Sequence, residues 1–173
     1  DNSVAMGLDT TASSKRSVAM GYHTTASSHN SVAMGNNTIS SGHNSVAMGA
    51  STKASGDDSV SMGNHTIVSG ARSVAMGYHT TTASDNMLTI GQYNDTTTNA
   101  LFVIGNGDSS NKSDALIVDD SGNLIVNEHT QLQDTSVNGI LSINDPVNNS
   151  DAAHKKYVDD LVNRLDNSMN NVK

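Results

Sequence analysis

The 173-residue chain has no cysteine and no tryptophan, and it contains one Phe and one Pro. Without cysteine, disulfide bonds and thiolate metal sites are excluded. Aromatic residues make up 3% of the chain and hydrophobic residues 35%. One large central core is therefore not expected, since such cores rely on bulky side chains that each contribute about 1.5–3 kcal/mol when buried. The scarcity of proline also argues against a disordered chain.

Basic residues and long apolar runs are scarce as well. Nine Lys and Arg face 17 Asp and Glu, which gives a formal net charge of −8. This balance argues against a nucleic-acid partner, because phosphate binding needs clustered Lys and Arg. No run approaches the roughly 18 apolar residues of a membrane span. No signal segment opens the chain, and since its first residues already lie in a repeat, we expect it to be a piece of a longer protein.

The chain does contain a strict repeat. Ser-Val-Ala-Met-Gly, or Ser-Val-Ser-Met-Gly at the fifth place, begins every 14 residues, at Ser3, Ser17, Ser31, Ser45, Ser59 and Ser73. Met87 to Gly91 is a degenerate seventh copy at the same spacing. A fixed period without insertions predicts coils that stack on one another.

Each repeat predicts two short strands and two turns. Alternation along the first strand places Val and Met on one face and Ser, Ala and Gly on the other. The Gly after Met predicts the first tight bend, because glycine accepts a positive φ, and the small residues at Ser14 or Gly42 predict the second. Fourteen residues with two bends predict a flattened β-roll, whose coils stack about 4.8 Å apart.

The stacking predicts two apolar ladders, one of Val and one of Met. They comprise Val4, Val18, Val32, Val46, Val60 and Val74, and Met6, Met20, Met34, Met48, Met62 and Met76. We interpret both ladders as core and trimer packing, and the Met ladder as core rather than a soft-metal array. One roll is too thin to bury such a face alone, and identical rolls around a three-fold axis would cover it. The sequence therefore predicts a homotrimer.

The rest of the chain predicts two further zones. Residues 100–104 form an apolar run typical of a buried strand, and residues 115–118 and 123–126 flank a turn and predict a hairpin. After Pro146 a helix is expected, with Val158, Leu161 and Leu165 on the seam of a short coiled coil. The predicted zones are a roll head (1–91), a β connector (92–143, in which residues 132–143 add another strand or two) and a neck with the start of a trimeric coiled coil (144–173).

No catalytic, cofactor or metal site is predicted. The chain lacks a nucleophile elbow, a phosphate loop and a zinc-protease motif, so we expect it not to be an enzyme. Three of its histidines share one turn column with Asp9, Asn37 and Ser51, which is typical of solvated turn residues; a metal would need several converging ligands. The variable turn residues are the candidate surface-binding residues: Tyr22, His23, Asn36, Asn37, His65, Tyr78 and His79.

The repeat resembles the head of the YadA-like trimeric adhesins. Residues 30–35 and 44–49 are similar to that family's Asn-Ser-Val-Ala-Ile-Gly motif, with Met in place of Ile. The resemblance covers residues 1–91. It implies a left-handed parallel β-roll packed as a trimer, and some members of the family bind collagen through this surface.

Residues 144–160 resemble a junction common in bacteriophage tail fibres and baseplate proteins. Three functions therefore stay open. The favoured one is a phage or prophage tail fibre on the virion, which attaches to a cell-surface receptor such as a glycan or protein. The others are a bacterial trimeric autotransporter adhesin at the cell surface, and a passive structural shaft.

Overall fold

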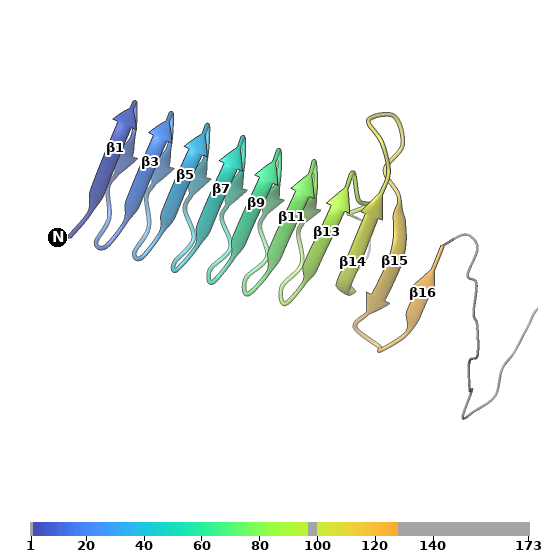
Figure 1. Ribbon diagram of the computed structural model, residues 1–173. Helices are drawn as coiled ribbons and strands as arrows, with labels where there is room; N and C mark the ends of the chain where they lie inside the picture. Colours follow the sequence, from blue (N-terminus) through green and yellow to red (C-terminus); the bar gives the residue numbers. More distant parts are fainter. Residues whose placement is uncertain (1, 97–99, 128–173) are drawn as a thin grey trace, which may run out of the picture. The chain divides into compact units, whose positions relative to one another are not determined.

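The computed structural model describes residues 2–96 and 100–127, and these residues form a stack of β-coils (Figure 1). Among them no helix occurs, so none is long and apolar enough to cross a membrane. The predicted strands between 132 and 143 and the coiled-coil seam at Val158, Leu161 and Leu165 lie outside the described residues. The prediction of an all-β parallel roll is confirmed.

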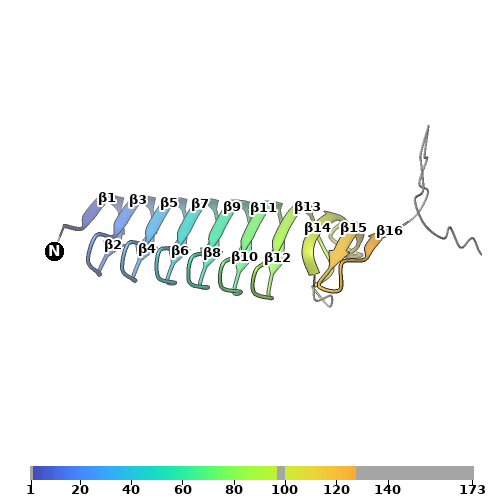
Figure 2. The ribbon, with the colours of Figure 1, turned by 90° about the horizontal axis from the view of Figure 1, so that it is seen from below.

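Each of the first six coils contributes one long and one short strand. The long strands and the short strands lie in two separate sheets, and successive coils pair in parallel (Figure 2). The long strands are β1 (Val4–Leu8), β3 (Val18–Tyr22), β5 (Val32–Asn36), β7 (Val46–Ala50), β9 (Val60–Asn64), β11 (Val74–Tyr78) and β13 (Leu88–Gln92). The short strands are β2 (Thr11–Ala12), β4 (Thr25–Ala26), β6 (Ile39–Ser40), β8 (Lys53–Ala54), β10 (Ile67–Val68) and β12 (Thr81–Thr82).

The strands pair in the register that the repeat predicts. Val4 lies beside Val18 and Met6 beside Met20, and the same pairs recur along the stack until Met76 meets Ile90 of the degenerate copy. The Val and Met ladders are therefore confirmed as ladders.

The interior of the roll is filled by small residues instead of Val and Met. Ala19, Ala33 and Ala47 are fully buried, whereas Met62 and Met76 are 37% and 39% exposed on the outer face of the long-strand sheet. The prediction that the Met column forms the core is thus wrong within one roll. The physical reason is that a five-residue strand faces only a two-residue strand, and the space between them admits Ala, Ser and Thr. Packing of the outer face against other chains stays a prediction.

The glycines after Met are needed for close approach between coils. A Cβ on Gly63, whose φ is +127°, would collide with the carbonyl oxygen of Gly77 in the next coil. The bend itself comes two residues after each glycine, at residues such as His65 (φ 55°) and Asn37 (φ 53°). The prediction that these glycines make the first bend is therefore corrected: they continue the strand and admit the neighbouring backbone.

Hydroxyl groups line the interior beside the alanines. Thr24, Thr38, Thr52 and Thr80 are buried, and their Oγ1 atoms have no hydrogen-bond partner. In the fifth coil Ser61 replaces the alanine, lies 2.7 Å from Thr66 Oγ1 and donates to the Thr66 carbonyl. One serine therefore satisfies a buried hydroxyl that the other coils leave unpaired.

The long-strand sheet continues beyond the recognisable repeat. β14 (Ala100–Asn106) pairs in parallel with β13, with Phe102 beside Leu88 and Gly105 beside Gly91. β15 (Asp114–Asp119) and β16 (Leu124–Val126) then add antiparallel strands, as predicted for a hairpin. The 14-residue register thus persists in the backbone after Gly91, where the sequence repeat fades.

The short-strand sheet ends on the side chain of Asn94. Its Oδ1 accepts from the Thr81 backbone N–H at 2.7 Å, and its Nδ2 donates to the Thr81 carbonyl at 2.9 Å. The amide group therefore makes the bonds that a peptide of another coil would make. Asn94 is fully buried, so the sheet ends with its edge strand satisfied.

We expect Ser61→Ala to lower the free energy of unfolding by about 1–2 kcal/mol, because it leaves the Thr66 hydroxyl buried and unpaired. Ala47→Ser should raise it by about 1 kcal/mol, since the fifth coil shows that the cross-section holds this serine. Urea titrations of both variants measure the two effects. Equal stability of both variants and the parent would contradict this role of the hydroxyls.

Gly63→Ala should destabilise the roll by at least about 2 kcal/mol, because the new Cβ meets backbone that cannot move alone. Gly122→Ala is the matched control: Gly122 also has a positive φ, +83°, but nothing lies within 4 Å of its added Cβ. The control should cost only the conformational strain, about 1 kcal/mol. Thermal unfolding followed by circular dichroism compares the two, and equal losses would argue against the close approach.

Candidate functional site

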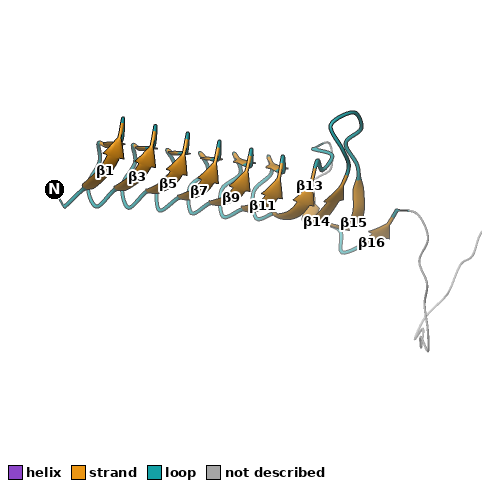
Figure 3. Cartoon of the chain, turned by 45° about the horizontal axis from the view of Figure 1, so that its top comes forward, coloured by secondary structure: helices purple, strands orange, loops and turns teal. Residues whose placement is uncertain are grey.

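The predicted surface-binding residues all lie along one edge of the stack, which we name the first-bend ridge. It consists of the two residues after the glycine of each coil: 8–9, 22–23, 36–37, 50–51, 64–65, 78–79 and 92–93. Figure 3 shows these bends as loops in a row beside the long strands. The second residue of each pair has a φ between 42° and 55°. Side chains in this column therefore leave the backbone in nearly the same direction in every coil.

Three rings stack along this column. The His65 and His79 centroids are 4.4 Å apart with an interplanar angle of 11°, and the His79 and Tyr93 centroids are 4.7 Å apart at 7°. Tyr78 stands edge-on to His79 at 4.5 Å and to Tyr93 at 5.4 Å. The ring spacing matches the coil spacing of about 4.8 Å, so the fold itself places the rings in contact. We name His65, His79 and Tyr93 the ring column.

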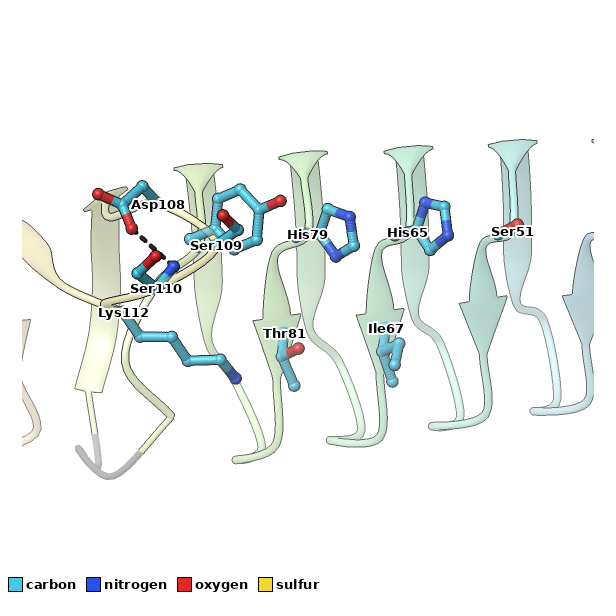
Figure 4. A pocket seen from close by; sticks show the side chains of 10 residues that line it. Ser51, His65, Ile67, His79, Thr81, Asp108, Ser109, Ser110 and Lys112 are labelled. Atoms are coloured by element: carbon cyan, nitrogen blue, oxygen red, sulfur yellow. Dashed lines mark hydrogen bonds between the residues drawn. The ribbon is translucent and has the colours of Figure 1, made fainter.

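An open groove of about 460 Å³ lies beside the ring column (Figure 4). Its wall on the roll consists of Ser51, His65, Ile67, His79, Thr81 and Tyr93. Its other wall is the loop between β14 and β15, with Asp108, Ser109, Ser110 and Lys112. The groove therefore combines rings, hydroxyl groups, one exposed aliphatic side chain and two opposite charges.

The loop wall is held by its own hydrogen bonds. Asp108 accepts from the backbone N–H groups of Ser110 at 2.7 Å and Asn111 at 2.9 Å, which lowers the pKa of its carboxyl group. Gln92 Nε2 donates to the Gly107 carbonyl at 3.0 Å, and Ser113 donates to Asn106 Oδ1 at 2.7 Å. The loop is thus fixed to the end of the ridge.

The electrostatics of the groove favour the neutral form of His79. Partial burial, then the neighbouring His65 and Lys112, lower the pKa of His79. The side-chain hydrogen bond between Tyr93 and Tyr78 raises the pKa of Tyr93. Lys112 forms no ion pair with any residue that the structure describes. Its ammonium group is therefore unpaired among the described residues.

The structure brings together only part of the predicted set. His65 and His79 line the groove, and Tyr78 packs edge-on against His79. Tyr22 and His23 form a separate edge contact, with centroids 4.0 Å apart, and Asn36 and Asn37 lie on the coil that follows them.

Sequence analysis missed Tyr93, Ser51, Ile67 and the loop wall. Tyr93 could have been found, because it lies 14 residues after His79. The position of Lys112 depends on how the loop folds, and the repeat carries no signal for it.

The opposite edge of the stack carries a ladder of polar side chains. Asn30 Nδ2 donates to Asn44 Oδ1 at 2.7 Å, and Asn44 Nδ2 donates to Asp58 Oδ1 at 2.8 Å. His29 and His43 stack in parallel with centroids 5.4 Å apart. Within residues 2–96 and 100–127, no three His, Asp or Glu side chains come together as a metal site would require.

Comparison with known proteins gives one finding. Residues 1–80 match the YadA head domain repeat, in overlapping two-copy windows at 1–24, 12–38, 26–52, 40–66 and 54–80. No curated protein matches the chain. The windows advance in steps of 14 residues or close to it, as the coils do. The roll formed by residues 1–80 is therefore a YadA-like head.

Proposed function

We propose that this chain is part of a homotrimeric attachment fibre, carried on a bacteriophage or prophage tail, that binds the surface of a host cell. The proposal rests chiefly on one observation: the outer face of the long-strand sheet in this YadA-like head is apolar and exposed or half-buried. The proposal also covers the location of the protein, which would be the virion exterior.

The outer face supports self-association. It presents a continuous Val ladder and a continuous Met ladder, and its members are exposed or half-buried, with Met62 at 37% and Met76 at 39%. Isolated exposed apolar residues are common, but a contiguous apolar face marks an interaction surface. Every coil repeats the same face, so identical chains aligned side by side would match coil by coil.

A trimer would also serve attachment. A trimer would carry three copies of the first-bend ridge, so that weak contacts combine into firm binding. Three chains carry a formal charge of −24, three times the −8 of one chain, which favours solubility over non-specific adhesion to anionic surfaces.

The proposal that the fibre belongs to a phage tail rests on the sequence outside the described residues. Residues 144–160 are similar to junctions of phage tail fibres, which supports a virion. A bacterial surface adhesin is the second candidate, and the match of residues 1–80 to YadA head repeats supports it.

Met48→Glu should disrupt the trimer, because three carboxylates would be buried together near the axis. Ile39→Glu is the control: Ile39 is 41% exposed on the short-strand sheet, so the same charge there should leave the assembly intact. Light scattering coupled to size exclusion measures the mass of both variants and the parent. A folded monomeric parent would refute the trimer.

Attachment is tested by staining with the labelled, purified trimer. Saturable staining of particular bacterial strains is the expected result for a phage tail fibre. Binding only to collagen, other matrix proteins or animal cells would replace that proposal with the bacterial adhesin. No binding to any of these would refute attachment through this chain and favour a passive shaft.

A further inference from the structure

The ring column ends at His65, and the next position beyond it holds no ring. Ser51 occupies the column position one coil before His65 and lines the same groove. Of the ring contacts within residues 2–96 and 100–127, those of His65 involve only the face toward His79. Coils repeat about every 4.8 Å. The other face of the His65 ring therefore lies above Ser51, where one further ring would fit.

A pyranose ring has the chemistry that this position requires. Its two faces carry C–H groups, which suit the electron-rich face of an aromatic ring, and its hydroxyl groups project around the rim. The groove offers the hydroxyls of Ser51, Thr81 and Ser110, each able to donate and accept. The lining combines ring faces with hydroxyl groups, and Ile67 is its single aliphatic residue. The lining therefore favours a sugar.

The free charge of the groove selects an acidic sugar. The Asp108 carboxylate is engaged by the N–H groups of Ser110 and Asn111, whereas Lys112 has no ion-pair partner among the described residues. Lys112 supplies an ammonium group to the groove lining, so an anion that enters the groove would be held there. A carboxylate is the natural partner of such a donor.

We infer that the groove binds a linear acidic oligosaccharide, with one pyranose ring on His65 above Ser51 and a carboxylate at Lys112. Ser51 and Tyr93 are three coils apart, about 14 Å, so the ligand spans more than one sugar unit. This inference rests on the proposed attachment function and names the class of receptor that the head recognises.

The direct test titrates the full chain with short oligosaccharides of glucuronic, galacturonic, mannuronic and sialic acids. Each is paired with its carboxyl-reduced form, which keeps the rings and hydroxyl groups but loses the charge. We expect at least one acidic oligosaccharide to bind and its reduced form to bind about tenfold more weakly. No binding by any acidic member, or equal affinity for a bound member and its reduced form, would overturn the inference.

Matched variants locate the site. Lys112→Gln should weaken binding of the acidic ligand about tenfold, while Lys15→Gln makes the same charge change on the opposite edge and should have no effect. His65→Asn removes the ring face but keeps a residue type that Asn37 shows to fit this backbone. His23→Asn is its control in the same column. Binding that survives both Lys112→Gln and His65→Asn unchanged would overturn the inference.

Ser51→His tests the inference independently, because it adds a ring at the position proposed for the sugar. Histidine already occupies this column at residues 23, 65 and 79, so the variant should fold, and its ring should cover the open face of His65. We expect it to abolish oligosaccharide binding, with unchanged thermal unfolding and oligomeric mass as the evidence of folding. A folded variant with full affinity would show that the ligand does not lie above Ser51.

The same variants separate failure of this inference from failure of the attachment function. If the parent trimer stains cells and Lys112→Gln and Ser51→His stain them equally well, attachment stands and the acidic-sugar groove is refuted. If only those two variants lose staining, both proposals are supported. If the parent trimer binds no cell or matrix but still binds an acidic oligosaccharide, the groove stands and cell attachment fails.

Discussion

The close approach of neighbouring coils is the constraint on which the rest of the structure depends. Each coil is too small to hold a core of its own, and its backbone groups are satisfied mainly by the coils on either side. At Gly49 and Gly63 the approach leaves no room for even a methyl group. The 14-residue period is therefore fixed by backbone geometry, and no residue can be inserted without breaking the contact on both sides.

This constraint also divides the side chains between the two faces. The interior is so narrow that its columns hold mainly Ala, Ser and Thr, and the largest fully buried side chains are Val68 and Val103. The larger residues of the alternating pattern must then lie outside. The low hydrophobic content of the chain is thus a direct result of the coil shape, and the apolar face that remains exposed is the one best suited to association.

The sequence predicted the period, the two ladders and the hairpin, because each depends only on spacing. It did not predict which face is buried, since alternation defines two faces without ranking them. Side-chain volume holds the missing information: a short strand opposite a long one leaves space for Ala19 and not for Met20. The bends were misplaced for a related reason. A glycine suggested a turn, whereas Gly63 serves a neighbouring coil and His65 makes the turn.

The candidate site was predicted in part for the same reasons. His65, Tyr78 and His79 were found because variable residues at a fixed bend stand out against a constant repeat. Lys112 lies in a loop that folds back on the ridge, and no sequence pattern predicts that contact. The fold does explain why the rings stack: one backbone conformation, repeated at a fixed spacing, aligns any two rings in successive coils. The ridge residues can therefore be substituted while the glycine and alanine columns keep the roll intact.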